Sequence, residues 1–211
     1  MRDLSKYQHP RFARMYARMS GQAEAFGMAG HRARLLSGLS GRVVEVGAGN
    51  GLNFPHYPTG VREVVAVEPE DHLRALAERA AGSAPVPVQV VAGHAAELPF
   101  DDAAFDAAVL SLVLCSVPSQ AAALAELRRV LRPGGELRFF EHVRSGNRVR
   151  ATLEHLVTPL WWRVCGGCHP NRDTTAAIRD AGFAIEENDR FVFRPMPGSP
   201  SMTHILGRAR R

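Results

Sequence analysis

The sequence predicts an α/β fold, a three-layer doubly wound sandwich around a mostly parallel seven-stranded sheet with one antiparallel edge strand and a helical amino-terminal extension. Three observations predict it. Strand-like and helix-like runs alternate from about residue 41 to residue 142, as in folds built from βαβ units. Residues 42–46 form a valine-rich run that leads into a turn with three glycines, which is typical of the first buried strand of such a sheet. A chain of 211 residues is long enough for one large core.

The remaining elements follow in a regular order. Residues 5–28 carry apolar side chains at helical spacing, and residues 31–39 read as a shorter helix ended by glycine. Further amphipathic helices are predicted at 71–81, 120–131, 151–163 and 174–181. Apolar or alternating runs predict strands at 61–67, 85–91, 105–112, 136–142, 183–187, 191–193 and 202–206, the last of them reversed.

Composition excludes several classes of protein. The hydrophobic share of 45% and the charged share of 22% are those of a soluble globular chain. The longest apolar run, 107–117, is too short to cross a bilayer, and the polar, arginine-rich start does not resemble a signal peptide. We therefore expect a cytoplasmic protein without an integral membrane segment. The net charge of +5 does not predict nucleic-acid binding, because the arginines are scattered and form no basic-aromatic motif.

The chain has three cysteines, Cys115, Cys165 and Cys168, which are too few for a disulfide framework. Residues 165–169 match the C-x-x-C-H pattern of c-type haem attachment, but that attachment needs export to an oxidising compartment. A single C-x-x-C also lacks the second ligand pair of a structural zinc site. We expect neither haem nor a metal ion.

A glycine turn follows the first strand and predicts a cofactor site. Gly47, Gly49 and Gly51 alternate with other residues, and Glu45 stands two residues before the first of them. Glycine has no Cβ to keep a ligand away from the backbone, so the turn brings amides close to a nucleotide-like molecule. Leu52 breaks the G-x-G-x-x-G dinucleotide fingerprint, and no Gly-Lys-Ser/Thr follows as in a P-loop. The acidic residue favours a cationic cofactor with an amino group over a pyrophosphate.

Two further strand ends belong to the predicted site. Glu68 follows the second strand, on the order of 20 residues past the glycines, where a carboxylate accepts hydrogen bonds from both ribose hydroxyls. The strand predicted at 105–112 is expected beside the first strand, with Ser111 in its carboxyl-terminal part. Its carboxyl end then opens onto the cofactor, because ligands of such sheets bind at the switch point outside the strand ends.

From about residue 41 to residue 142 the chain resembles the class I, Rossmann-type methyltransferases that use S-adenosyl-L-methionine. The resemblance rests on the order of E-x-G-x-G-x-G, an acidic strand end, L-P-F, F-D before an apolar strand, and L-R-P-G-G. It narrows at residues 111–117, 141–143 and 166–173, which resemble the alkyl thiol S-methyltransferases of animals and their bacterial relatives. That group is itself similar to the ubiquinone and menaquinone C-methyltransferases. We expect no counterpart of the amino-terminal membrane anchor of the animal enzymes.

The resemblance implies roles for individual residues. The glycine loop would wrap the methionine part of the cofactor, Glu45 would lie near its amino group, Glu68 would hold the ribose, and Ser111 and Leu112 would flank the sulfonium. The full set of expected cofactor contacts is Glu45, Gly47, Ala48, Gly49, Asn50, Gly51, Asn53, Glu68, Pro69, His94, Ala95, Ser111 and Leu112. We expect one domain over residues 1–211, with a helical segment (1–40), a cofactor-binding core (41–142) and a part that holds the acceptor lid and the last strands (143–211).

The expected reaction is an in-line methyl transfer to a small apolar acceptor, a thiol in our first hypothesis. The protein then mainly holds donor and acceptor in line, and a histidine base would help the thiol to lose its proton. His142, at the end of the fifth strand, is our first choice for that base and His169 our second. Acceptor contacts are expected from Tyr16, Cys115, Trp161, Trp162 and Arg172.

Other functions stay open at this point. A quinone-type C-methyltransferase is the nearest alternative, and a cofactor-binding protein without catalytic activity is another. A dinucleotide oxidoreductase is argued against by Leu52. The sequence gives neither the acceptor's identity nor the oligomeric state.

Overall fold

A seven-stranded sheet runs through the molecule, with the strands in the order β3-β2-β1-β4-β5-β7-β6. The computed structural model describes residues 3–211 of the chain. The strands are β1 (Gly41–Val46), β2 (Val61–Val67), β3 (Val88–Val91), β4 (Phe105–Ser111), β5 (Leu131–His142), β6 (Ala184–Phe193) and β7 (Met202–Arg210). Strands β1 to β5 pair in parallel, and β7 is antiparallel to both of its neighbours. The reversed strand thus lies one place inside the edge, and β6 forms the edge itself.

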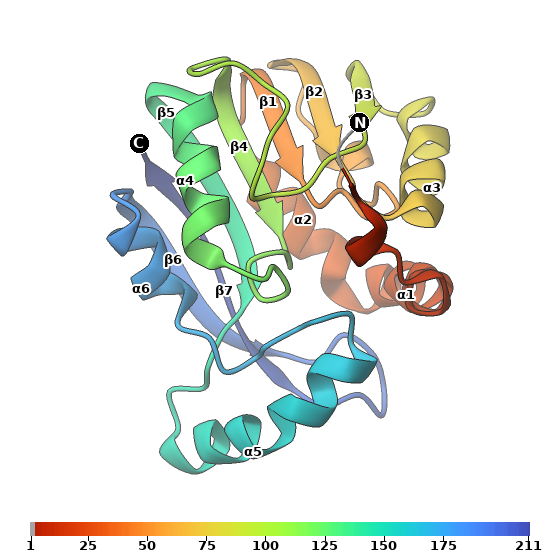
Figure 1. The fold of residues 1–211 in the computed structure, drawn as a ribbon, viewed down its shortest axis with the longest axis vertical. Helices are drawn as coiled ribbons and strands as arrows, with labels where there is room; N and C mark the ends of the chain where they lie inside the picture. The colour runs from red at the N-terminus through yellow and green to blue at the C-terminus, as the bar shows by residue number, and fades with distance from the viewer. Residues whose placement is uncertain (1–2) are drawn as a thin grey trace.

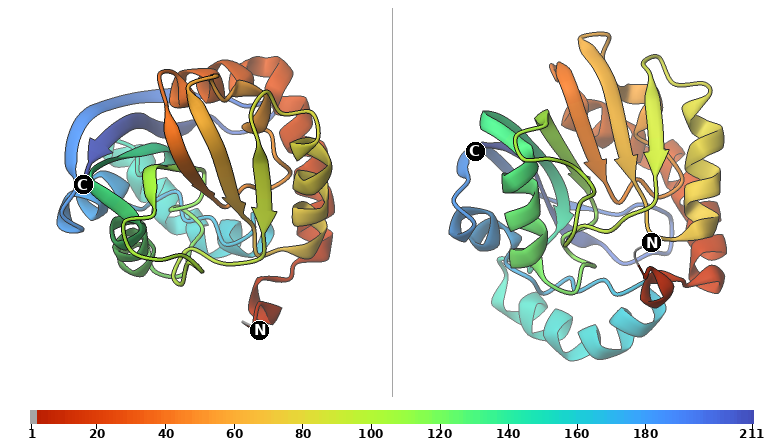
Figure 2. Two further views of the ribbon diagram at one scale, coloured as in Figure 1. Left: turned by 90° about the horizontal axis from the view of Figure 1, so that it is seen from above. Right: turned by 45° about the horizontal axis from the view of Figure 1, so that its top comes forward.

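Helices cover both faces of this sheet (Figure 1; Figure 2). The helices of the chain are α1 (Pro10–Ala23), α2 (Ala29–Leu36), α3 (Asp71–Ala81), α4 (Gln120–Val130), α5 (Arg148–Val164) and α6 (Thr174–Asp180), and α5 lies beyond the carboxyl ends of the strands instead of on a face (Figure 1). Because successive strand residues point to opposite faces, Val44 contributes to the core under α4 and α6, whereas Val43 contributes to the core under α2 and α3. The expected three-layer α/β sandwich is confirmed.

Several element boundaries differ from the sequence prediction, and three strands show the largest changes in pairing. Strand β3 begins at Val88 instead of residue 85, because Pro85 and Pro87 have no N–H group for the ladder. Strand β5 begins directly after α4, where Leu131 pairs with Phe105 before a shift of register. Strand β6 is continuous, since the intervening residues 188–190 also pair with β7.

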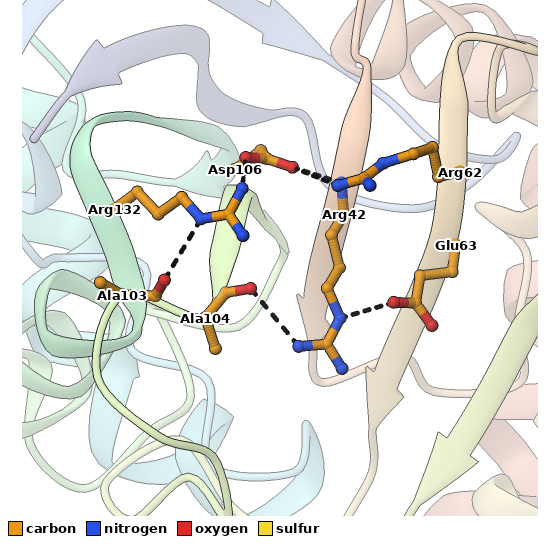
Figure 3. Close-up of polar contacts among 7 residues, drawn as sticks. All are labelled: Arg42, Arg62, Glu63, Ala103, Ala104, Asp106 and Arg132. Carbon is orange, nitrogen blue, oxygen red and sulfur yellow. Dashed lines mark hydrogen bonds and ion pairs between the residues drawn. The ribbon is translucent and has the colours of Figure 1, made fainter.

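The amino-terminal ends of the strands are joined by a charged cluster around Asp106 (Figure 3). Its carboxylate accepts the backbone N–H of Arg42 at 2.7 Å and a guanidinium N–H of Arg62 at 3.2 Å, and it also pairs with Arg132. The cluster thereby connects the starts of β1, β2, β4 and β5, at the opposite end of the sheet from the glycine turn.

None of the helices within residues 3–211 combines the length and the apolar character needed to span a membrane.

Candidate active site

The glycine turn follows the carboxyl end of β1. Helices α1 and α5 lie at the same end of the sheet (Figure 1). Gly47, Gly49 and Gly51 have φ values of 73°, 57° and 80°, in the region that favours glycine. A Cβ on Gly47 would lie 2.5 Å from the side chain of Val113, so the turn is packed closely against the segment after β4. The backbone of the turn is therefore held in one conformation at the mouth of the sheet.

Glu68 connects the glycine turn to the end of β2. Its carboxylate accepts N–H groups from Gly49 at 2.8 Å and from Glu70 at 3.0 Å. Burial raises the pKa of Glu68 to about 7, and the two backbone hydrogen bonds oppose that rise. The predicted neighbourhood of Glu68 and the glycines is thus observed.

A buried polar chain extends from Glu45 to the end of β4. The Glu45 carboxylate accepts from Asn53 at 2.8 Å and from the Tyr57 hydroxyl at 2.7 Å. Arg32 donates to the Asn53 side-chain oxygen at 2.9 Å and to the Ser111 hydroxyl at 3.3 Å. Both oxygens of Glu45 therefore accept hydrogen bonds from the protein, and Asn53 links Glu45 to Arg32. Burial raises its pKa to about 7, against the two hydrogen bonds and the Arg32 charge.

Arg32 is a site residue that the sequence reading did not name. Only 5% of the residue is exposed, and its guanidinium also pairs with Glu24 at 2.9 Å. The sequence does contain a sign that Arg32 is buried. Leu35 and Leu36 follow it at the helical spacings of three and four residues, so all three side chains share one face of the helix. The guanidinium is buried at the end of β4, and a buried guanidinium matches a ligand carboxylate in charge and geometry.

The amino-terminal segment packs against residues of the predicted cofactor site. The Gln8 amide donates to the Pro69 carbonyl at 2.8 Å and accepts the N–H of Asp71 at 3.1 Å, which ties it to the end of β2. Tyr7 stacks on His94 with 5.0 Å between ring centroids. Further along, Tyr16 of α1 lies against Gly49, 3.4 Å from where a Cβ would stand. Two other predicted contacts are used within the chain: Asn50 donates to Ser20, and Ala95 is buried in the core.

The segment after β4 is fixed by Glu141. Its carboxylate accepts the N–H groups of Val113 and Leu114 at 2.9 Å and of Cys115 at 3.1 Å. Burial raises the pKa of Glu141 to about 7 in spite of these hydrogen bonds. Leu112, just before them, has φ of 61°, a strained value for leucine of the kind that clusters at functional sites.

Arg172 also holds this segment. It donates to the carbonyl oxygens of Leu114 at 2.6 Å and Val117 at 2.7 Å. The sequence reading gave it an acceptor contact, but the structure uses its guanidinium to join two loops of the chain.

Next to this segment, two cysteines and a histidine come together. The Nδ1 atom of His142 lies 3.8 Å from Cys115 Sγ and 3.5 Å from Cys168 Sγ. The pKa of Cys168 is lowered, first by the hydrogen bond from the Cys115 thiol and then by His142, whereas the pKa of Cys115 is raised. Cys165, the other member of the C-x-x-C, is not in this group.

The other residues predicted to act on the acceptor are His169, Trp161 and Trp162, and they differ in their contacts and in their exposure to solvent. The backbone N–H of His169 donates to the Cys115 carbonyl at 2.7 Å, and its ring centroid lies 6.4 Å from that of Trp162. Trp161 is half-buried, and its indole Nε1 is buried without a hydrogen-bond partner among residues 3–211. Trp162 is 48% exposed.

These residues fit S-adenosylmethionine. Gly49 offers bare backbone, Glu68 offers a carboxylate for ribose hydroxyls, and Arg32 offers a guanidinium for the carboxylate of the methionine part.

Comparison with known proteins agrees with this fit. Residues 44–139 match the family described as a methyltransferase domain. The chain is 36% identical over 180 residues to human thiol S-methyltransferase TMT1B, covering 82% of this chain and 73% of that protein. It is 32% identical over 120 residues to a demethylmenaquinone methyltransferase of Paenarthrobacter aurescens, covering 57% of this chain and 42% of that one.

Solved structures share the fold. A possible histamine N-methyltransferase of Thermotoga maritima superposes with a TM-score of 0.71 at 22% identity, covering 95% of this chain and 96% of the other. A putative methyltransferase of Bacillus halodurans does so with a TM-score of 0.70 at 20% identity, covering 85% and 97%. The matched methyltransferase domain and the similarity to thiol S-methyltransferases agree with the glycine turn and Glu68. The chain therefore belongs to the class I S-adenosylmethionine-dependent methyltransferases, in the same family as those thiol enzymes.

Proposed function

We propose that this enzyme transfers the methyl group to a small apolar thiol. The observation that supports the thiol most strongly is the similarity to thiol S-methyltransferases over 82% of the chain, against 57% for the demethylmenaquinone enzyme of Paenarthrobacter aurescens. Bound at the crevice, the cofactor supplies a methyl group on a positively charged sulfur. The chain's own residues then have to orient it and to bring an acceptor lone pair into line.

Each end of the crevice has a distinct task in this proposal. Glu68 and Gly49 hold the ribose and the methionine backbone, and Arg32 pairs with the methionine carboxylate. Ser111 and the strained Leu112 stand at the end of β4, where the acceptor approaches. The loop after them is kept in place by Glu141 and Arg172.

In this proposal the acceptor binds on the side of the site next to helix α5, and that helix is rich in apolar side chains. Helix α5 leaves a series of large hydrophobic side chains exposed: Val149, Leu153, Leu156, Val157, Leu160, Trp162 and Val164. Such a series favours an acceptor with an alkyl or aryl group over a charged one. The acceptor thiol must also lose its proton, and in this proposal the group formed by Cys115, His142 and Cys168 assists that step.

The test is a product assay with the full chain. Purified protein is incubated with S-adenosylmethionine and, in separate reactions, a hydrophobic alkanethiol, glutathione, a phenol and a quinol, and S-adenosylhomocysteine and methylated products are measured. We expect the alkanethiol to be the preferred acceptor. Methylation of the quinol at carbon would favour a quinone-type enzyme instead. Tight cofactor binding with no product from any acceptor would favour a non-catalytic protein.

A further inference from the structure

One group of potential metal ligands stands out among residues 3–211, and the sequence reading expected no metal there. Cys115, His142 and Cys168 each offer one ligand atom, and the three atoms lie within 4.8 Å of one another. They come from three separate segments: the turn after β4, the last residue of β5 and the turn after α5. Cys115 and Cys168 are 1% and 5% exposed. The group is therefore a product of the tertiary fold and not of the C-x-x-C motif.

The two nitrogen–sulfur separations match edges of a zinc tetrahedron. With Zn–S of about 2.3 Å and Zn–N of about 2.05 Å, tetrahedral geometry separates a sulfur from a nitrogen ligand by about 3.6 Å. The observed separations between His142 Nδ1 and the two sulfurs are 3.5 and 3.8 Å. Two thiolates and an imidazole are also the donor set that zinc prefers.

The two loops that carry the cysteines are held together independently of any ion. The His169 N–H donates to the Cys115 carbonyl, and Arg172 donates to the carbonyls of Leu114 and Val117. Glu141 fixes the backbone N–H of Cys115. These contacts hold the sulfurs near His142, which lowers the cost of ordering the ligands when a metal binds.

The group also lies beside the cofactor crevice. Helix α1 contacts both places: Tyr16 packs on Gly49, and the Phe12 ring packs so closely on Gly166 that it leaves no room for a Cβ there. Cys115 is four residues beyond Ser111, in the segment that begins at the end of β4.

We propose that Cys115, His142 and Cys168 bind one zinc ion and that its fourth position binds the acceptor thiol as a thiolate. This inference rests on the proposed thiol methyltransferase function and deepens it. Three protein ligands with one open position are the pattern of catalytic zinc sites, whereas structural sites use four.

The chemistry balances without a further reagent. The acceptor thiol loses its proton to solvent as its sulfur binds zinc in place of water. With two cysteine thiolates and a neutral imidazole the zinc centre is uncharged, so the third thiolate makes it anionic and keeps that sulfur nucleophilic. Its lone pair forms the new S–CH₃ bond while the C–S bond of the sulfonium breaks and that electron pair stays on the leaving sulfur. The products are a thioether, which is a weak zinc ligand, and uncharged S-adenosylhomocysteine.

The first measurement is zinc content. Full-length protein is loaded with zinc, dialysed against metal-free buffer and analysed by mass spectrometry for metal. We expect about one zinc per chain in the wild type and a loss of most of it in Cys115→Ser and Cys168→Ser. Cys165→Ser is the matched control, because Cys165 belongs to the same turn but not to the ligand group, and it should keep its zinc. A wild type without zinc, a Cys115–Cys168 disulfide in its place, or equal loss in Cys165→Ser would overturn the proposal.

Cobalt spectroscopy of the wild type makes the test independent of whether a variant folds. Replacement of zinc by Co²⁺ should give sulfur-to-cobalt charge-transfer absorption that grows when an alkanethiol is added and not when the matching alcohol is added. No thiol-dependent change would overturn the open fourth position.

Activity separates this proposal from the function on which it rests. Removal of zinc should slow alkanethiol methylation by roughly 100-fold at saturating cofactor, with cofactor affinity retained by calorimetry. An unchanged rate would overturn the role of zinc while leaving thiol methylation in place. Zinc binding with a thiol-dependent cobalt spectrum, but no methylated thiol, would support the site and contradict the proposed function.

Discussion

At the level of single residues, Arg32 connects the amino-terminal helices to the crevice. It is buried, and it contacts Glu24, Asn53 and Ser111, which belong to three different segments. Its planar guanidinium can serve these partners and a ligand carboxylate together, whereas an ammonium group cannot reproduce that geometry.

Replacement of this arginine tests the assignment. We expect Arg32→Lys to weaken S-adenosylmethionine binding by roughly 10- to 100-fold, measured by calorimetry. Arg34→Lys is the matched control on the same helix, because Arg34 pairs with Asp189 at the surface with half of its side chain exposed. Equal affinities of Arg32→Lys and the wild type would contradict a contact between Arg32 and the cofactor.

Glu45 makes stability depend on pH. Its pKa is raised by burial from 4.5 to about 7, so between these values the carboxyl ionises in the unfolded chain before it does so in the fold. Ionisation of Glu45 therefore costs stability progressively as pH rises from about 4.5 to 7. Glu45→Gln removes this cost, and its stability relative to the wild type should improve by on the order of 3 kcal/mol between pH 4.5 and pH 8.

The measurement is urea unfolding without cofactor at these two pH values. Parallel pH profiles for the wild type and Glu45→Gln would show that burial of Glu45 does not raise its pKa.

At the level of elements, the glycine turn carries the cofactor contact. Gly49→Ala should lose most cofactor affinity, because the new Cβ stands at the bare backbone that faces the crevice, 3.4 Å from the Tyr16 ring. Gly134→Ala is the control for backbone strain, since Gly134 also has positive φ, at 75°, but nothing lies near its Cβ position. Both variants should lose about 1 kcal/mol of stability, and only Gly49→Ala should lose binding. Similar cofactor titrations for the two would remove the turn from the site.

Helix α5 governs acceptor choice if its exposed apolar side receives the acceptor. The double variant Leu156→Gln, Leu160→Gln should raise KM for a long alkanethiol several-fold and leave kcat nearly unchanged, because it removes apolar contact made equally before and during the reaction. A short hydrophilic thiol is the control acceptor and should show no change in KM. Equal effects on both thiols would indicate damage to the helix instead of lost contact.

At the level of the whole molecule, stability and activity are placed at opposite ends of the sheet. The cluster around Asp106 joins the strand beginnings (Figure 3), and Glu68 and Gly49 of the predicted site lie at the strand ends. Asp106→Ala should therefore cost roughly 2 to 3 kcal/mol of unfolding free energy, because the Arg42 N–H loses its acceptor and the guanidinium groups of Arg62 and Arg132 lose a partner. Cofactor affinity should stay at the wild-type value.

Denaturant titration and calorimetry check both parts of this prediction. Asp102→Ala is the control, since Asp102 pairs with Arg129 while 79% of its side chain is exposed, and it should cost well below 1 kcal/mol. A loss of cofactor affinity in folded Asp106→Ala would show that the two ends are coupled.

The sequence by itself determined the α/β fold class, the strand that leads into the glycine turn and the acidic residue at the end of β2. These are local properties, because alternating periodicity, β-branched runs and glycine spacing act between neighbours in the chain. It also determined the helices at 71–81 and 120–130 to within a residue.

Only the tertiary structure decided that Arg32 faces the crevice, that Glu141 and Arg172 hold the segment after β4, and that Cys168 joins Cys115 and His142 instead of Cys165. Each of these contacts links residues 26 or more positions apart, with the exception of the Arg32–Asn53 pair at 21. Local sequence patterns do not predict contacts between residues so far apart in the chain. Such pairs form only after the strands lie side by side and their ends meet at one edge of the sheet.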